Sequence, residues 1–234
     1  NGSWGFGMTT DQKDLPSLLP QVLKSARAQK RKEKVTVKET TSETVKMEKK
    51  AKKRFVDEDK IDFLKGVEAS ASDQSDRISS VTGSVTAVER WIRIHTSEER
   101  TVETRVDKIS LRMSIACKES NNIEHRSKTW GGVGGMEFLL EQEDSVREGT
   151  AQLAREADLL VDAEHSPSAV VDCVLSNSLA GTLLHEAFGH AVEADLIASN
   201  ESLLAGKIGE QVAASCVTMQ DDPTRLLYGY YLDR

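Results

Sequence analysis

The sequence predicts an α+β protein, in which an antiparallel sheet with flanking helices forms a central domain and a strand followed by a helix begins a C-terminal domain. Three patterns support this fold class. Apolar residues alternate with polar or small ones over 109–117, as in a strand with one buried face. Apolar residues recur at helical spacing over 142–160. A nearly continuous apolar run, 170–175, directly precedes an apolar helical segment.

The composition indicates which broad class of protein this chain belongs to. The chain has 234 residues, 38% hydrophobic and 29% charged, as is ordinary for a soluble protein. No run approaches the roughly 20 apolar residues of a membrane span, and the start carries no secretory signal pattern. Cys117, Cys173 and Cys216 lack Cys-x-x-Cys spacing, so neither a disulfide framework nor a self-contained zinc knuckle is indicated. We therefore expect a cytoplasmic protein without a membrane segment.

The first predicted element is a helix. Thr9, Thr10 and Asp11 offer capping side chains, and apolar residues follow at helical spacing from Leu15 to Ala26. A proline in the first turn is compatible with a helix, but Pro20 lies deeper and should kink it.

Two basic clusters, Lys24–Lys34 and Lys46–Arg54, hold six lysines and arginines each. Such clusters can contact nucleic acid or simply form a solvated surface or linker. The chain has a net charge of −7, and no aromatic residues interleave the clusters for base stacking. We therefore favour the solvated surface and expect no direct binding of nucleic acid.

The central region predicts a helix followed by a meander of about four antiparallel strands. Asp57 is the expected N-cap of a helix that runs through Val67 and ends in a polar turn. Strand patterns then follow, with turns expected at 97–100 and 119–122. The predicted strand segments are 85–94, 102–106 and 109–117.

The glycine-dense run Trp130–Gly135 should not hold a regular strand, so its backbone must bend or closely approach a neighbour. No Gly-Lys-Ser/Thr follows, which excludes a phosphate loop. Two interpretations stay open: a tight connection packed under the sheet, or a wall of a peptide-binding cavity.

His165-Ser166-Pro167 breaks the chain and marks the main predicted boundary. We divide the chain into the tail of an N-terminal domain (1–32), a central α+β domain (33–164) and the start of a C-terminal domain (165–234). In the last of these, 170–175 is expected to form a strand buried on both faces. Ser176-Asn177-Ser178 should cap the next helix, and 214–219 should form a further strand.

That helix carries His185, Glu186 and His190, a combination that chemistry explains better than packing. Two imidazoles on one helix can bind one metal ion beside a carboxylate that acts on water. A step of five residues, however, leaves side chains about 140° apart on a regular α-helix. We predict a π-bulge that brings the rings together, with Gly189 as the residue that best tolerates the distortion. The alternative is a chance pattern with histidines that serve only packing.

The segment Leu184–Asp195 resembles the signature helix of the TldD/PmbA family of metallopeptidases, in its metal-carrying branch. Further matching segments occur in the order found in that family. They are Gly2-Ser3-Trp4-Gly5-Phe6, Gly131-Gly132-Val133-Gly134-Gly135, Gly206-Lys207-Ile208-Gly209-Glu210-Gln211-Val212, Val217-Thr218 and Asp221-Asp222.

This resemblance implies a zinc-dependent peptidase in which His185 and His190 bind zinc and Glu186 is the general base. It implies peptides or unfolded proteins as substrates, in a closed cavity formed with a TldE/PmbA-like paralogue or a second copy of the chain. The third ligand of the family is a cysteine downstream of this chain, so we expect a fragment that is inactive alone and lacks most of the N- and C-terminal domains. Within this chain, Glu193 and Cys216 are the possible substitutes for the third ligand, but the family pattern gives neither residue that role.

Two further expectations concern roles around the site. Glu193 and Asp195 are interpreted as residues that orient a ligand or cap the helix, in preference to direct ligation. The alternative function is a non-catalytic regulatory or scaffolding subunit, because the family has also been described as modulators of DNA gyrase. Retention of His185, Glu186 and His190 favours the peptidase.

Overall fold

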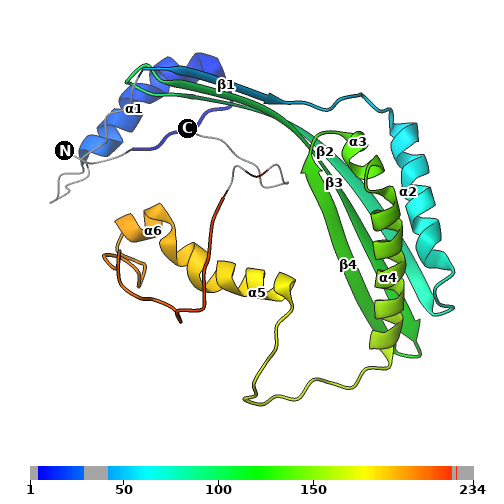
Figure 1. The fold of residues 1–234 in the computed structure, drawn as a ribbon. Helices are drawn as coiled ribbons and strands as arrows, with labels where there is room; N and C mark the ends of the chain where they lie inside the picture. The colour runs from blue at the N-terminus through cyan, green and yellow to red at the C-terminus, as the bar shows by residue number, and fades with distance from the viewer. Residues whose placement is uncertain (1–4, 29–41, 223–224, 226–234) are drawn as a thin grey trace. The chain divides into compact units, whose positions relative to one another are not determined.

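The computed structural model describes residues 5–28, 42–222 and 225 (Figure 1). The chain divides into two compact units. The first comprises the described residues of 1–46 and 92–103, and the second those of 47–91 and 104–233. Among the described residues, no helix is both long and apolar enough to cross a membrane.

The first unit contains helix α1 (Leu15–Ala28), which follows a 3-10 turn, η1 (Gln12–Asp14). Asp11 caps this turn as predicted, because its carboxylate accepts a hydrogen bond of 2.9 Å from the backbone N–H of Lys13. The helix continues through Pro20. None of its residues is buried, so its apolar side is only partly covered within the described chain. The basic cluster Lys24–Lys34 falls largely outside the described residues.

Four strands form one sheet: β1 (Thr44–Lys49), β2 (Ile78–His95), β3 (Thr101–Glu119) and β4 (Asn122–Val133). β3 is central and pairs with each of the others. It pairs antiparallel with β4, and the register places Ile115 opposite Arg126. The predicted meander is present but has three strands, β2, β3 and β4, because the predicted segments 102–106 and 109–117 belong to the single strand β3; β1 joins the sheet at β3. The predicted turns lie between these strands, and Glu99 and Ser120 adopt positive φ there.

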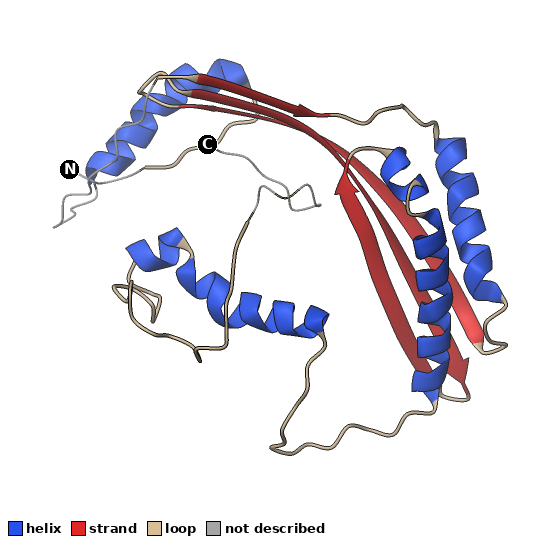
Figure 2. Cartoon of the chain, in the orientation of Figure 1, coloured by secondary structure: helices blue, strands red, loops and turns tan. Residues whose placement is uncertain are grey.

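Two long helices of the second unit, α2 (Asp57–Ser72) and α4 (Glu143–Val161), lie side by side against the sheet (Figure 2). The predicted alternation over 109–117 is confirmed, because the odd-numbered side chains of this part of β3 are buried. α2 begins at Asp57, one residue after its N-cap, Val56, and not after Asp57 as predicted. The core shared by these elements includes Phe63, Val67, Ile109, Leu111, Met113, Ile115, Trp130, Val146, Leu153 and Ala154.

The glycine-dense run is a strand for longer than predicted. β4 continues through Gly131 and Gly132 to Val133, and the break comes only at Gly134, which has a φ of +127°. The expected close approach is present at Gly132, where an added Cβ would lie 2.2 Å from Cε2 of Phe138. Phe138 belongs to α3 (Met136–Leu140), a short helix that the sequence analysis missed. The missing side chain at Gly132 therefore lets α3 fold back onto the strand.

Two carboxylates hold the segment that enters α2. Asp107 accepts a hydrogen bond of 2.8 Å from the backbone N–H of Ala51. Glu137 accepts bonds from the backbone N–H groups of Lys52, at 2.8 Å, and of Gly135, at 3.0 Å. Partial burial alone would raise the pKa of Glu137, but these backbone N–H groups favour the ionised form and the pKa is lowered overall.

Beyond α4 the predicted strands are absent. Residues 170–175 form no strand, and Val170 and Val174 are fully exposed. Residues 214–219 likewise form turns and extended chain without strand pairing. Both predictions were wrong for the same reason: a buried strand needs a neighbouring strand to pair with, and no described residues supply one here.

The rest of this segment is a series of short helices. They are α5 (Asn177–Leu184), a π turn η2 (His185–Gly189), a 3-10 turn η3 (His190–Val192) and α6 (Ala194–Ala198). α6 ends at Ala198, and Asn200, two residues later, takes a φ of 60°.

Candidate metal centre

The candidate site is built on α5, whose start matches the sequence prediction. The hydroxyl of Ser176 accepts a hydrogen bond of 3.3 Å from the backbone N–H of Leu179, which satisfies one of the free donors of the first turn. Apolar residues without β-branching, among them Leu179, Leu183 and Leu184, then favour the helix. α5 thereby delivers His185 at its C-terminal end.

The predicted π-bulge is confirmed. The helix changes to a π turn over His185–Gly189, in which the backbone N–H of His190 donates to the carbonyl of His185, five residues earlier. The reason given for Gly189 was wrong, because its φ of −55° and ψ of −52° are ordinary helical values that any residue adopts. A Cβ added at Gly189 would instead lie 3.4 Å from Nδ1 of His185. This is an ordinary contact distance, so alanine would fit at position 189 and a larger side chain would crowd the imidazole.

The π turn brings the three predicted site residues together. The ring centroids of His185 and His190 lie 4.6 Å apart, with an angle of 67° between the rings. Oε2 of Glu186 lies 3.6 Å from Nε2 of His190. One potential ligand atom from each of the three residues falls within 4.8 Å of the others. All three side chains are exposed, so an ion could reach them without a change in the backbone.

A fourth residue contacts the group. Oε1 of Glu193 lies 2.7 Å from Nδ1 of His190, on the ring nitrogen opposite the one that faces Glu186. The hydrogen bond and charge of Glu193, with a smaller contribution from Glu186, raise the pKa of His190. Asp195 does something different, since its carboxylate accepts a bond of 3.0 Å from the backbone N–H of Leu196 in α6.

The donor set fits a metal ion of intermediate softness. Imidazole nitrogens and a carboxylate suit zinc, and two histidines with a nearby glutamate are a common part of catalytic zinc sites. No further histidine or cysteine of the described chain joins the group. Cys216 and Cys173 are exposed free thiols outside it, and Glu193 bonds to His190. The residues present thus fit part of a metal site.

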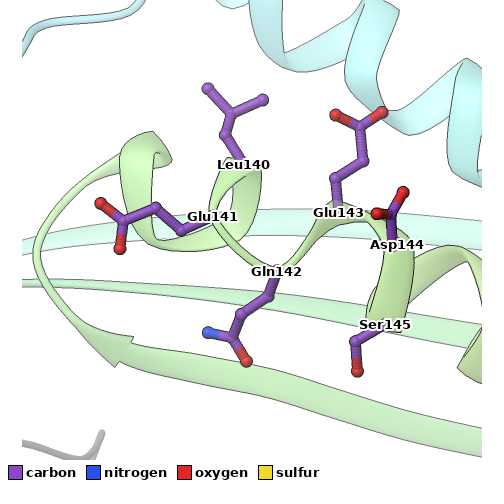
Figure 3. Close-up of a pocket in the computed structure, with 6 residues that line it drawn as sticks. All are labelled: Leu140, Glu141, Gln142, Glu143, Asp144 and Ser145. Carbon is purple, nitrogen blue, oxygen red and sulfur yellow. The ribbon is translucent and has the colours of Figure 1, made fainter.

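Other candidate positions do not form a comparable group in the described chain. His95, His125 and His165 are exposed and lie outside the group. The acidic junction between α3 and α4, residues 140–145, lines a hollow of about 420 Å³, in which Glu141 points away from Glu143 and Asp144 (Figure 3). Glu141 pairs with Lys52 at 3.0 Å, and Glu143 with Arg147 at 2.6 Å. These carboxylates already have cationic partners.

One feature beside the site was missed from the sequence. An apolar hollow of about 600 Å³ lies between the π turn and the loop that follows α6. Phe188 and Val192 line it from the same stretch as the histidines, and Lys207 and Glu210 contribute charge. The four-residue spacing of Phe188 and Val192 was a signal for one side of this hollow. The other side is the loop after α6, whose sequence has no periodic pattern, so the hollow itself was not predicted.

Comparison with known proteins identifies relatives of the chain. The family model of the PmbA/TldA metallopeptidase central domain matches residues 53–161. That of the PmbA/TldA metallopeptidase C-terminal domain matches residues 168–233, which include the candidate metal centre. The two matched segments are consecutive and together take up most of the chain.

Several curated proteins are similar over long segments. A metalloprotease of Methanothermobacter thermautotrophicus is 30% identical over 232 residues, which cover 99% of this chain and 50% of that protein. A metalloprotease of Archaeoglobus fulgidus is 38% identical over 48% of this chain and 26% of its own length. A metalloprotease TldD homolog of Haemophilus influenzae is 29% identical over 71% of this chain and 35% of its own length. The chain thus spans half or less of each of these relatives.

Proposed function

Because this chain belongs to the PmbA/TldD metallopeptidase family, we propose that it carries the metal centre of a peptidase that hydrolyses peptides or unfolded proteins. One observation supports this most strongly. Two imidazoles and a carboxylate from one short stretch of the family-matched segment, His185, Glu186 and His190, converge within 4.8 Å of one another through a π turn. Packing alone gives no reason for such a convergence of exposed polar side chains.

We propose His185 and His190 as two ligands of a zinc ion. When bound, zinc would lower the pKa of a water molecule and polarise the peptide carbonyl. The two rings are held on one rigid stretch of backbone, since α5 leads into the π turn without a break. That arrangement fixes the spacing between the ligands before any ion binds.

Glu186 is the proposed general base. Its carboxylate lies 3.6 Å from Nε2 of His190 and is exposed, so the attacking water can reach it. Oε2 of Glu186 would accept a proton from that water as it attacks the carbonyl carbon. The same atom would then donate the proton to the amine that leaves when the C–N bond breaks.

The wider organisation is also part of the proposal. We keep the division into 1–32, 33–164 and 165–234, and we place the protein in the cytoplasm. A TldE/PmbA-like paralogue or a second copy of the chain would supply a partner and close the substrate cavity. The apolar character of the hollow beside Phe188 and Val192 suits an unfolded substrate with exposed apolar side chains.

The alternative, a non-catalytic regulator of DNA gyrase, has less support. The described residues retain the complete His185, Glu186 and His190 group. The relatives bear the name metalloprotease.

Zinc binding and peptide hydrolysis test the proposal. Zinc titrated into the metal-free chain should bind at one site, and His185→Ala or His190→Ala should each weaken binding at least tenfold. His165→Ala, which alters an exposed histidine outside the group, is the matched control. The full-length protein should cleave an unstructured peptide and lose that activity on chelation. A zinc affinity that is the same in wild type, His185→Ala and His190→Ala would refute the assignment.

A further inference from the structure

The two ring nitrogens of His190 face different carboxylates. Nδ1 lies 2.7 Å from Oε1 of Glu193, a hydrogen-bonding distance, whereas Nε2 lies 3.6 Å from Oε2 of Glu186. Only the contact with Glu193 is therefore a hydrogen bond. The ring is anchored on its Nδ1 side and presents Nε2 to the group that contains His185 and Glu186.

The local backbone explains this contact. The 3-10 turn His190–Val192 ends at Glu193, whose backbone N–H donates to the carbonyl of His190 at 3.2 Å. Glu193 then leaves the helical conformation, with a φ of −60° and a ψ of 133°. This turn holds the carboxylate of Glu193 beside Nδ1 of His190, three residues earlier. Asp195 is not an equivalent candidate, because it bonds to the backbone of α6.

The chemistry of the contact fixes the position of a proton. An ionised carboxylate only accepts hydrogen bonds, so the nitrogen that faces Glu193 must carry the hydrogen. A neutral imidazole carries a single N–H proton, and Nε2 is then left with a free lone pair. A histidine binds a metal ion through such a lone pair, and the bond made by its other nitrogen decides which nitrogen is available.

We propose that Glu193 is a positioning residue, which holds His190 in the Nδ1-protonated tautomer and turns Nε2 toward the metal centre. The effect on metal affinity rests on the proposed function, but the tautomer is a property of the metal-free chain. Glu193 contacts neither substrate nor metal in this role and acts only through His190. Its neighbour Glu186 keeps the separate role of base.

The tautomer can be measured directly. Long-range proton–nitrogen correlation NMR on the ¹⁵N-labelled, metal-free chain, at about pH 8.5 where imidazoles are neutral, distinguishes protonated from unprotonated ring nitrogens. His190→Gln assigns the signals. Wild type should show the proton on Nδ1, and Glu193→Ala should move His190 toward the Nε2-protonated form that an unrestrained histidine favours. Glu193→Gln, which keeps an acceptor oxygen, should retain much of the wild-type state.

The matched control is Glu201→Ala, an exposed carboxylate of the same segment. The signals of His185 serve as an internal reference, because they should remain unchanged if the π turn persists in each variant. A wild-type His190 protonated on Nε2, or a tautomer that is unchanged in Glu193→Ala, would overturn the proposal. If Glu193→Ala disturbs the π turn, the tautomer of His190 in Glu193→Gln is compared with that in wild type, and this comparison tests the proposal instead.

A zinc titration separates this inference from the proposed function. Glu193→Ala should weaken zinc binding roughly ten- to hundredfold, with Glu193→Gln in between and Glu201→Ala unchanged. Equal zinc affinity in Glu193→Ala and wild type would overturn the positioning role. A chain with the expected tautomer that binds no zinc at all would instead count against the proposed function and leave the tautomer assignment in place.

Discussion

The rings of His185 and His190 lie with their centroids 4.6 Å apart, although the two residues are separated by one position more than an α-helical turn allows. The contact exists because the backbone N–H of His190 bonds to the carbonyl of His185 across the π turn. A Cβ at Gly189 would lie 3.4 Å from Nδ1 of His185, an ordinary contact, so only a side chain larger than that of alanine would crowd the ring. The backbone of the π turn therefore sets the relative positions of the two imidazoles.

Replacement of Gly189 by valine should reduce metal affinity more than stability. The backbone at Gly189 is ordinary helix, so valine meets no strain in φ or ψ, but its branched methyl groups crowd the His185 ring. We expect zinc affinity to fall at least tenfold by titration, while the free energy of unfolding changes by less than about 1 kcal/mol. Gly189→Ala should have a smaller effect on both. Unchanged zinc affinity in the valine variant would contradict this account.

Replacement of Glu186 by glutamine should separate binding from catalysis. Glutamine keeps the size of the side chain but cannot accept the proton from water. Turnover of an unstructured peptide by the full-length protein should fall about 10²- to 10⁴-fold, while zinc affinity stays within a few fold. Glu201→Gln should leave both unchanged, because that exposed carboxylate lies outside the group. Wild-type turnover in Glu186→Gln would mean that another group accepts the proton.

Replacement of Gly132 by alanine should destabilise the sheet. The new Cβ would lie 2.2 Å from the Phe138 ring, so the ring or α3 must shift, at a cost of about 1–3 kcal/mol in the free energy of unfolding. Urea denaturation followed by tryptophan fluorescence can measure this, since Trp130 is buried in the core.

Two controls make the Gly132 experiment specific. Gly181→Ala places a Cβ in open space on α5 and should be neutral or stabilising by about 0.5–1 kcal/mol. In the background of Phe138→Ala, the substitution at Gly132 should cost much less, because the ring that it would strike is gone. An equal cost with and without the ring would show that the clash is not the cause.

Glu137 should make stability depend on pH in the acid range. Its pKa is lowered in the folded chain, so its contribution to stability is complete above the ordinary glutamate pKa and is lost as the pH falls through the lower folded value. The urea midpoint of wild type should therefore decrease from about pH 5 downward, and Glu137→Gln should be less stable at pH 7 and show a shallower decrease. Glu141→Gln, which removes only an exposed ion pair with Lys52, should keep the wild-type profile.

Much of the fold followed from local patterns. The alternation along 109–117 identified β3 because its partners, β2 and β4, are adjacent in sequence and supply both edges. The cap at Ser176 and the π turn were predictable for the same reason, since both depend on neighbouring backbone groups. The convergence of His185, Glu186 and His190 followed from the π turn.

The incorrect predictions required information that a local pattern does not contain. Val170 and Val174 have the composition of a buried strand, but burial depends on a partner that the described residues do not provide. Gly131 and Gly132 have poor strand propensity, yet pairing with Ser110 and Ile109 holds them in β4. The distinction between Glu193 and Asp195 also needed coordinates, because the sequence does not show that the helical conformation breaks at Glu193, between η3 and α6.

The π turn also has a consequence for everything that follows it in the chain. One added residue rotates the helical phase by about 100°, so Leu184 and Val192, on either side of the turn, do not belong to a single helical wheel. Removal of Ala187 would shorten the motif to His-Glu-x-x-His, and an ordinary α-helix would still bring the imidazoles together. Because the π turn absorbs the extra residue, His190 lies where the fourth residue of an α-helical turn would lie, and the polypeptide beyond it would keep its direction. The extra residue thus shifts the sequence pattern by one position after the site and leaves the path of the chain unchanged.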